Sequence, residues 1–267
     1  EAASKHLTPV TLELGGKSPA IVCSDAPVRL ACERIAKGKF LNAGQTCVAP
    51  DYVLVHESVH EEFIRTMKDV IEEFFGNVSA RPEEMTLMAS ERHFSRVAAL
   101  IPSGNAADGG PSVAAGGFTD RATNYISPTV LDGCGWDDPA MREEIFGPVL
   151  PVLTFKDLQA DVIDRINGGE KPLSLYLFTR DRRTVRSVLS SVSFGGGCIN
   201  DTVMHLGNEN LPFGGVGNSG MGAYHGKTGF ETFSHMKSIL QKPSLLNFDL
   251  LKPPYGRKLR LIRKFYR

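Results

Sequence analysis

The run Asn42-Ala43-Gly44-Gln45-Thr46-Cys47-Val48-Ala49-Pro50 places one cysteine directly after a glycine-containing turn. Upstream, Glu13 stands in the run Leu12-Glu13-Leu14-Gly15-Gly16-Lys17-Ser18-Pro19. A thiol nucleophile and a carboxylate base are the two reacting groups needed to carry an acyl group through a covalent thioester. The double glycine after Glu13 would let the backbone turn so that carboxylate and thiol share one pocket. The two runs therefore predict a thiol-based catalytic site.

Each of these residues also has a structural interpretation. Cys47 by itself is compatible with an inert buried thiol, and Glu13 by itself with a carboxylate that accepts backbone N–H groups. The small and polar residues around Cys47 leave room at the sulfur and favour the catalytic interpretation.

A third run, Glu143-Glu144-Ile145-Phe146-Gly147-Pro148, combines two carboxylates, a ring and a turn. A surface pair of glutamates alone carries no function, but the following Phe-Gly-Pro makes a rigid turn that presents one carboxylate and one ring. A carboxylate can bind ribose hydroxyls and a ring can pack on a nicotinamide. No histidine spacing ties a histidine to Cys47, which makes a Cys-His hydrolase the weaker interpretation, although His205 or His225 can still lie nearby in space.

Short apolar runs rich in β-branched residues alternate with helical patterns along the chain. Strands are predicted at residues 10–14, 20–23, 52–56, 129–131, 150–154, 174–178 and 197–199. Helices are predicted to start at Asp25, at a capping box of Ser58 and Glu61, and at Ser90, Asp157 and Asp181, with Gly76 ending the second. Residues 102–120 are predicted to form an exposed loop. This alternation predicts an α/β domain with a largely parallel sheet flanked by helices.

The pattern changes after residue 200. Residues 211–222 contain five glycines, at positions 214, 215, 217, 220 and 222. Such a segment either lets the backbone approach a ligand or another chain closely, or forms a plain surface loop, and composition alone does not choose between them.

Composition limits the classes of function. The 267 residues carry no formal net charge, which gives no support for a nucleic-acid partner. No apolar run approaches the ~20 residues of a membrane span. The five cysteines are scattered without CxxC spacing, which argues against a disulfide framework and a zinc site and predicts no metal. Reduced thiols indicate a cytoplasmic protein.

The basic residues are concentrated at the end of the chain. Residues 252–267 contain seven of the 30 Lys and Arg and none of the 30 acidic residues, so the remainder has 23 basic against 30 acidic residues, a net of −7. Apolar residues are interleaved with the basic ones. The segment is therefore predicted either to touch an anionic membrane at its cytosolic face or to be a solvated tail.

Together these motifs resemble the aldehyde dehydrogenase superfamily. Residues 12–19 look like its glutamate motif, residues 44–47 like its cysteine motif and residues 143–148 like its cofactor-ribose turn. The runs His6-Leu7-Thr8-Pro9-Val10 and Glu170-Lys171-Pro172-Leu173, with the glycine-rich stretch and Tyr224-His225-Gly226-Lys227 after it, are similar to the class 3 branch, which includes the fatty aldehyde enzymes.

The resemblance implies roles for four residues. Cys47 would attack the aldehyde carbon, hydride would pass to NAD or NADP, and Glu13 would activate the water that hydrolyses the thioester. The backbone N–H of Cys47 would donate to the oxyanion. Glu144 would hold the nicotinamide ribose, with Phe146 beside it. The substrate would be an aliphatic aldehyde of medium or long chain, and the protein would be a homodimer.

The resemblance also implies a domain plan. Residues 1–14 would end the cofactor-domain region, 15–200 would form the catalytic thiol domain, 201–245 the return and bridging segment, and 246–267 the basic tail. The chain, which does not begin with methionine, is predicted to be the C-terminal portion of a longer protein, without the N-terminal Rossmann-like domain, and to bind cofactor poorly alone. Two alternatives remain, a non-redox paralogue that acts as a binding or dimerisation partner, and a cysteine esterase that uses Cys47 and Glu13.

Overall fold

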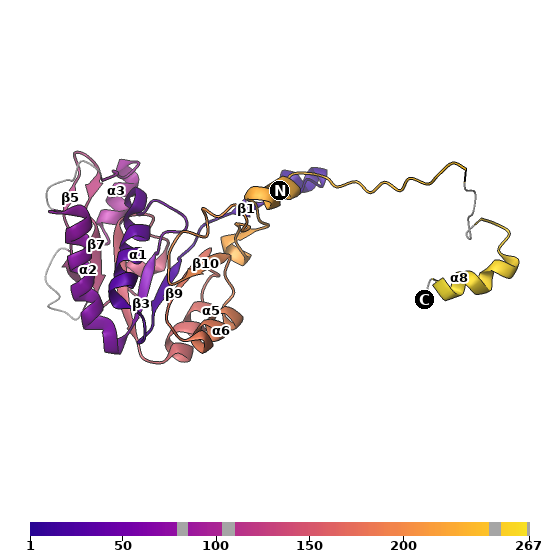
Figure 1. The fold of residues 1–267 in the computed structure, drawn as a ribbon. Helices are drawn as coiled ribbons and strands as arrows, with labels where there is room; N and C mark the ends of the chain where they lie inside the picture. Colours follow the sequence, from indigo (N-terminus) through magenta and orange to yellow (C-terminus); the bar gives the residue numbers. More distant parts are fainter. Residues whose placement is uncertain (79–84, 103–109, 246–251, 266–267) are drawn as a thin grey trace. The chain divides into compact units, whose positions relative to one another are not determined.

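A seven-stranded sheet in the order β10-β9-β2-β3-β8-β7-β4 organises the larger of two units in the computed structural model (Figure 1). The structure describes residues 1–78, 85–102, 110–245 and 252–265, and the units are Glu1–Phe233 and Ser234–Arg267. The strands of the sheet are β2 (Pro19–Val22), β3 (Tyr52–His56), β4 (Ser112–Ala115), β7 (Thr129–Asp132), β8 (Val149–Phe155), β9 (Ser174–Phe178) and β10 (Gly196–Ile199). All neighbouring strands run parallel except β4, which pairs antiparallel with β7 at one edge.

Shorter strands and the helices complete the larger unit. Two-stranded pairs are formed by β1 (Leu12–Glu13) with β11 (Gly220–Met221), and by β5 (Thr119–Asp120) with β6 (Tyr125–Ile126). The helices are α1 (Val28–Phe40), α2 (His60–Phe75), α3 (Glu91–Ala98), α4 (Pro139–Arg142), α5 (Asp164–Asn167), α6 (Arg182–Ser191) and α7 (Gly226–Thr232).

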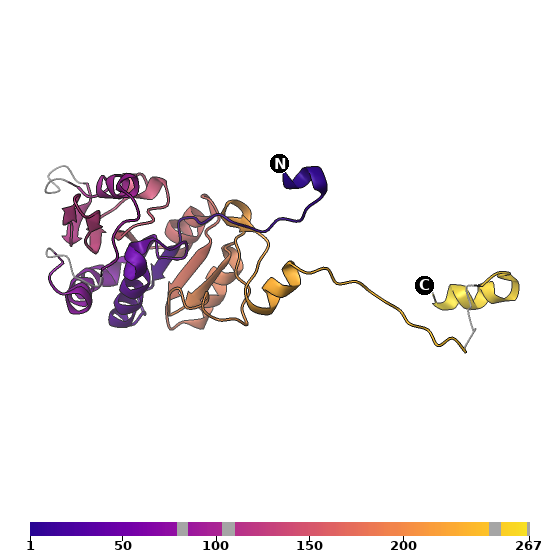
Figure 2. The ribbon, with the colours of Figure 1, turned by 90° about the horizontal axis from the view of Figure 1, so that it is seen from above.

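The sheet is buried on both faces, which is why its strands are almost continuously apolar. Side chains alternate along each strand: Ile21 packs with α3, α5 and α6, whereas Ala20 and Val22 pack with α1 and α2. Figure 2 shows these helical layers from above. The predicted α/β class with a parallel sheet flanked by helices is therefore confirmed, with one antiparallel edge strand added.

The three motif runs precede three strands that are neighbours in the sheet. The run with Glu13 leads into β2, the run with Cys47 into β3, and the run with Glu144 into β8, and these strands are adjacent in the order β2-β3-β8. Because parallel strands begin at the same edge of a sheet, the fold brings all three runs to one place. The site lies at the amino ends of the strands.

Three of the predicted helix starts are correct, because in each the side chain of the predicted cap accepts from an N–H in the first turn of the segment that follows. Ser90 accepts a hydrogen bond from the His93 N–H, and Asp157 and Asp181 cap the helical segments that follow them. Gly76 follows the last residue of α2 at φ 63°, as predicted.

Two predicted caps are wrong. Asp25 lies before Pro27, which occupies the N-cap position of α1, and its carboxylate instead accepts from Thr179 and from the backbone N–H groups of Arg180 and Asp181. Ser58 does not cap α2 either, because its own N–H donates to the His56 ring and α2 begins at His60. At Asp25 tertiary donors occupy the carboxylate, and at Ser58 the neighbouring His56 ring accepts from the backbone N–H.

Two extended segments also differ from the prediction. A strand is predicted at residues 10–14, but only Leu12–Glu13 pairs, and Leu12 and Leu14 are exposed. In the expected loop 102–120, residues 103–109 lie outside the described residues, while Ser112–Ala115 forms β4 and Thr119–Asp120 forms β5. Pairing with β7 and β6 overrides the glycine-rich composition.

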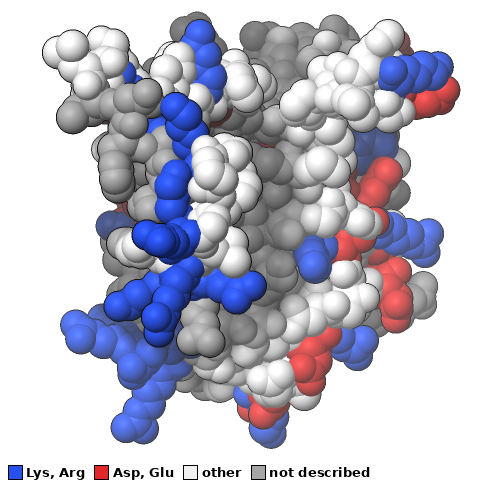
Figure 3. All heavy atoms as spheres, turned by 90° about the vertical axis from the view of Figure 1, so that its right-hand side faces the viewer, with Lys and Arg blue, Asp and Glu red and all other residues white. Residues whose placement is uncertain are grey.

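The smaller unit holds α8 (Leu259–Phe265), preceded by a short helical turn at Gly256–Lys258. Figure 3 shows the molecule coloured by charge, with a group of blue Lys and Arg side chains that has no red carboxylate among them. Among the described residues, no helix has both the length and the apolar composition needed to cross a membrane.

Candidate active site

The turn before Cys47 has an unusual backbone. Three consecutive residues, Asn42, Ala43 and Gly44, have positive φ angles of 52°, 51° and 70°. Asparagine and glycine tolerate this region, whereas a buried alanine does so only under strain. The side-chain amide of Gln45 donates to the Leu87 carbonyl (3.0 Å) and accepts from the Ala89 N–H (2.8 Å), and so fixes the turn to a distant segment. A strained turn held in this way presents the thiol in one position.

Gly44 is required by space as well as by its backbone angle. A Cβ atom at Gly44 would overlap the carbonyl oxygen of Gly147, in the turn that follows Glu144. The absence of a side chain therefore lets the cysteine turn and the glutamate turn touch.

Replacing Gly44 with alanine is expected to lower the free energy of unfolding by roughly 2 kcal/mol or more, because left-handed strain is added to overlap with backbone. Gly133 is the matched control, since its φ is 75° and nothing lies within 4 Å of its Cβ position. Thermal unfolding of Gly44→Ala and Gly133→Ala measures the difference. Equal losses in the two variants would show that the contact with Gly147 is not tight.

Cys47 and Glu13 are brought together. The pKa of the Cys47 thiol is raised to about 11 by burial first, and then by the negative charge of Glu13 and a side-chain hydrogen bond with it. The backbone N–H of Cys47 opposes this shift by donating toward the sulfur. The thiol is thus mostly protonated at neutral pH, and a carboxylate that can accept its proton lies beside it.

Glu13 is held by the glycine-rich segment. Glu13 pairs with Gly220 across the β1–β11 ladder, and the Leu14 N–H donates to the Ser219 carbonyl (3.0 Å). A Cβ atom at Gly220 would overlap the Leu12 carbonyl oxygen, and the φ of Gly220 is 153°. Residues 211–222 are therefore not a plain surface loop, because their backbone packs on residues 12–14 of the same chain, and the approach to a ligand or another chain stays a prediction.

Glu144 lies against the glycines that follow Glu13. A Cβ atom at Gly15 would be 2.7 Å from Oε2 of Glu144, so a side chain there would displace this carboxyl group, and the φ of 78° also favours glycine. The pKa of Glu144 is raised to about 7, first by burial and then by the charge of Asp51, while a hydrogen bond from the Gly16 backbone lowers it. Glu144 is thus an acceptor whose charge changes near neutral pH.

Phe146 lies two residues further along the same turn. Its φ is 50°, and 37% of its side chain is exposed. Arg96 of α3 holds this turn by donating to the carbonyl oxygens of Glu144 (3.2 Å) and Ile145. The ring is therefore presented at the surface by a fixed backbone.

Asp51, which sequence reasoning did not single out, joins all three runs. Its N–H donates to the Ser18 carbonyl (2.7 Å), its Oδ1 accepts from the Ile145 N–H (2.9 Å), and its Oδ2 is paired with the Lys17 ammonium. Lys17 also donates to the carbonyl oxygens of Ala140 and Glu143. A charged residue directly before an apolar strand, and a lysine inside the glutamate motif, were the signals available in the sequence.

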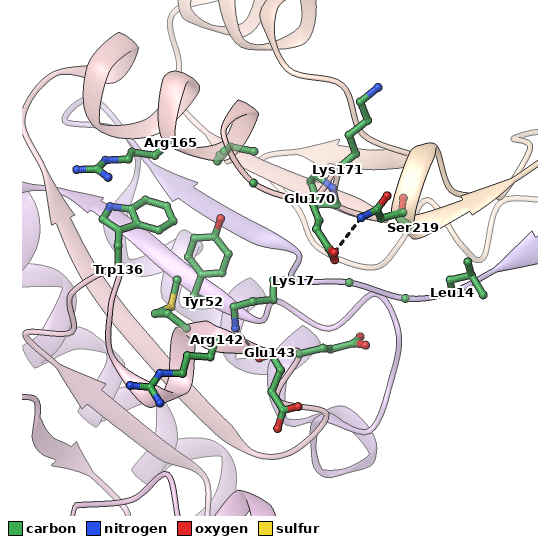
Figure 4. Close-up of a pocket in the computed structure, with 18 residues that line it drawn as sticks. Leu14, Lys17, Tyr52, Trp136, Arg142, Glu143, Arg165, Glu170, Lys171 and Ser219 are labelled. Carbon is green, nitrogen blue, oxygen red and sulfur yellow. Dashed lines mark hydrogen bonds between the residues drawn. The ribbon is translucent and has the colours of Figure 1, made fainter.

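A cavity of about 480 Å³ opens beside this network (Figure 4). The residues that line it include Gly15, Gly16, Lys17, Tyr52, Trp136, Glu144 and Glu170, with Asn218 and Ser219 from the glycine-rich segment. Cys47, Glu13 and Phe146 are not among its lining residues, so the cavity meets the site only on the Glu144 side.

His205, which the sequence left as a residue that could lie near Cys47, contacts other side chains. Its Nδ1 lies 3.5 Å from Sγ of Cys198 and its Nε2 lies 3.2 Å from Oγ of Ser174. Burial lowers the pKa of His205. His205 is therefore the partner of a different cysteine, and in the described part of the chain no hydrogen bond joins a histidine to Cys47.

Comparison with known proteins agrees with this geometry. Residues 1–239 match the aldehyde dehydrogenase family. The chain is 46% identical over 254 residues to the dimeric NADP-preferring aldehyde dehydrogenase of Canis lupus familiaris, covering 95% of this chain and 54% of that protein. It is 46% identical over 243 residues to aldehyde dehydrogenase family 3 member A2 of Rattus norvegicus, covering 91% and 48%.

A solved structure described as the substrate-bound state of Staphylococcus aureus AldH superposes with a TM-score of 0.92 at 47% identity, covering all of this chain and 57% of that one. The chain thus spans about half the length of the relatives it matches. The predicted resemblance to the class 3 branch is confirmed, and the chain belongs to the aldehyde dehydrogenase family.

Proposed function

We propose that the protein to which this chain belongs oxidises an aldehyde to the carboxylic acid with NAD or NADP, through a thioester on Cys47. The observation that carries the proposal is the strained, glycine-packed turn that presents Cys47, beside a Glu13 carboxylate whose charge raises the pKa of the thiol. Membership of the aldehyde dehydrogenase family supports it.

In this proposal Cys47 is the nucleophile. As its sulfur adds to the carbonyl carbon, the thiol proton passes to Glu13 and the carbonyl oxygen becomes an oxyanion, which accepts from the Cys47 N–H. A bound nicotinamide ring supplies the hydride acceptor for the oxidation. Glu13 then releases the thiol proton to solvent and takes a proton from water, and the resulting hydroxide attacks the thioester carbon. The carbon–sulfur bond breaks, the Cys47 thiolate takes the proton back from Glu13, and the acid is released.

The residues present fit a nicotinamide nucleotide at Glu144. Its half-buried carboxyl group lies in the space left by Gly15 and has no lysine or arginine among its hydrogen-bond partners in the described residues. Glu144 would accept from the ribose hydroxyls, and the exposed Phe146 ring would pack beside the nicotinamide. The similarity to an NADP-preferring relative supports a nicotinamide cofactor without choosing between NAD and NADP.

The proposal also covers the substrate, the oligomeric state and the location of the protein. We propose a medium- or long-chain aliphatic aldehyde as substrate, from the class 3 resemblance, and a homodimer, from the similarity to a relative named as dimeric. The basic end of the chain, with α8, would allow peripheral contact of a cytoplasmic protein with an anionic membrane surface. The domain plan with a catalytic domain at 15–200, a bridging segment at 201–245 and a tail at 246–267 remains part of the proposal.

The test is formation of reduced nicotinamide, followed by absorbance, with the complete protein, NAD⁺ or NADP⁺, and hexanal, hexadecanal or benzaldehyde. Aldehyde-dependent reduction is expected, fastest with an aliphatic aldehyde. If Cys47 is alkylated readily but no aldehyde produces reduced cofactor, the non-redox paralogue is the better interpretation.

A further inference from the structure

Lys17 is a mostly buried lysine that holds backbone as well as a carboxylate. Its side chain is 19% exposed, and its ammonium is paired with Asp51, whose side chain is 4% exposed. The same ammonium donates to the carbonyl oxygens of Ala140 (2.9 Å) and Glu143 (3.0 Å). These acceptors match the three N–H groups of a lysine, so the ammonium is fully used within the protein. What Lys17 holds therefore defines its role.

The ion pair of Lys17 and Asp51 holds the backbone on both sides of Glu144. Lys17 donates to the carbonyl oxygen of the preceding residue, Glu143. Asp51 accepts from the N–H of the following residue, Ile145, at 2.9 Å. These two groups belong to the two peptide groups that flank the Cα atom of Glu144. Because flanking peptide groups define φ and ψ, the ion pair fixes the backbone of Glu144 at both ends, and we call this pair the Lys17–Asp51 clamp.

The segment that carries Lys17 also holds the side chain of Glu144. The carboxyl group lies against Gly15 and accepts from the backbone of Gly16, and Lys17 is the next residue. Figure 4 shows Lys17 pointing toward the segment that contains Glu143, at the wall of the cavity that Glu144 also lines. A side chain that is held at its backbone and at its far end has few orientations left.

The clamp connects the Glu144 turn to the two other motif runs. Lys17 belongs to the run that contains Glu13, and Asp51 directly follows the run that contains Cys47. The Asp51 N–H donates to the carbonyl oxygen of Ser18 (2.7 Å), so these two runs are also joined to each other. The direction of the Glu144 carboxyl group is thus set by the same segments that carry the proposed reacting groups.

We propose that Lys17, together with Asp51, is a positioning residue that holds both peptide groups of Glu144 and so aims its carboxylate at the ribose hydroxyls of a nicotinamide nucleotide. The ribose role of Glu144 rests on the proposed function, whereas the clamp on its backbone does not. Without Lys17 the Glu143 carbonyl loses its donor, and the carboxylate spreads over several orientations. Ordering it again on binding costs conformational entropy, so the nucleotide binds more weakly.

A double-mutant cycle in the complete protein tests the proposal, with dissociation constants for NAD⁺ and NADP⁺ measured by calorimetry. Lys17→Met and Glu144→Ala are each expected to weaken binding by about 10-fold. In the Glu144→Ala background, Lys17→Met is expected to have no further effect, because Lys17 acts through that side chain. Lys156→Met is the matched control and is expected to bind normally, because the ion pair of Lys156 with Glu57 is exposed. A Lys17→Met effect that is absent, or equally large in both backgrounds, overturns the proposal.

The variant Asp51→Ala separates position from charge. The pKa of Glu144 is raised first by burial and then by the charge of Asp51, whereas Lys17 lowers it. If the clamp acted only through charge, Asp51→Ala would favour the ionised carboxylate and strengthen binding. Because Asp51 holds the Ile145 N–H, Asp51→Ala is instead expected to weaken binding by about 10-fold, in the same direction as Lys17→Met. Tighter binding by Asp51→Ala overturns the proposal.

A second measurement needs no cofactor. Hydrogen exchange of residues 143–148, followed by mass spectrometry, is expected to be about 10-fold faster in Lys17→Met than in the wild type, because the turn opens locally. Unchanged exchange in these residues overturns the proposal even if the wild type binds no nucleotide, a result that would by itself refute only the proposed function.

Loss of the fold is distinguished by a variant without either charge. Lys17→Met leaves the buried Asp51 carboxylate without its cation, so its unfolding temperature is expected to fall. Lys17→Met combined with Asp51→Asn removes both charges, and the asparagine oxygen can still accept from Ile145. This double variant is expected to unfold close to the wild type and still to bind nucleotide about 10-fold more weakly, because the Glu143 carbonyl remains without a donor. Normal binding by it, or faster exchange in β9 as well as in residues 143–148, overturns the proposal.

Discussion

Replacing Cys47 with alanine in the complete protein is expected to lower kcat for aldehyde oxidation by at least about 1,000-fold, because no other group can form the thioester. Activity with NAD⁺ and NADP⁺ is measured by absorbance, and the unfolding temperature is measured alongside. The substitution removes one sulfur atom from a half-buried position, so the fold should be retained.

Cys198→Ala is the matched control for this experiment. Cys198 is also half-buried and also contacts a titratable side chain, but its partner is His205 in a separate cluster. Its replacement is expected to leave kcat nearly unchanged. If Cys198→Ala abolished activity and Cys47→Ala did not, the nucleophile would have been assigned to the wrong thiol.

Replacing Glu13 with glutamine is expected to have two opposite effects. The value of kcat should fall by about 10²–10⁴-fold, because the base that deprotonates the thiol and water is lost. The pKa of Cys47 should fall from about 11, because both the charge of Glu13 and its hydrogen bond raise that pKa. The pH midpoint for alkylation of Cys47 by iodoacetamide should therefore move to lower pH while turnover decreases.

This divergence separates a general base from a structural carboxylate. A purely structural Glu13 would, when replaced, lower turnover and unfolding temperature together and leave no consistent shift in thiol titration. An alkylation midpoint that moves to higher pH would contradict the electrostatic assignment of Glu13. Glu143→Gln is a suitable control, since Glu143 is exposed and pairs with Arg96 away from the thiol.

The sheet was predictable from sequence because its strands are buried on both faces. The apolar runs at β2, β3, β8 and β9 are too short for buried helices and therefore indicate buried strands. The segments between them have helical periodicity. β4 was missed because an edge strand pairs on one side only, so its sequence is less constrained. The predicted caps at Asp25 and Ser58 are wrong because other groups compete. Donors at residues 179–181 occupy the Asp25 carboxylate, and the His56 ring accepts from the Ser58 N–H, and a local rule includes neither.

The motif residues of the candidate site could be predicted from the sequence, whereas the residue that holds the three motifs together could not. Cys47, Glu13, Glu144 and Phe146 stand in short motifs and were named from them. The role of Asp51 depends on which strands are neighbours, because Asp51 reaches Ser18 and Ile145 only when β2, β3 and β8 are adjacent. No spacing along the chain encodes that order.

The two residues proposed to react, Cys47 and Glu13, are attached to parts of the protein with different stability. Cys47 precedes a central strand of the main sheet, whereas Glu13 is carried by the two-residue β1 and β11 pair, which is not part of that sheet. Local unfolding of such a short ladder costs far less than unfolding the core. Under the proposed function, activity is therefore expected to be lost at a lower temperature or denaturant concentration than the one that unfolds the sheet, because it depends on the short β1–β11 pair.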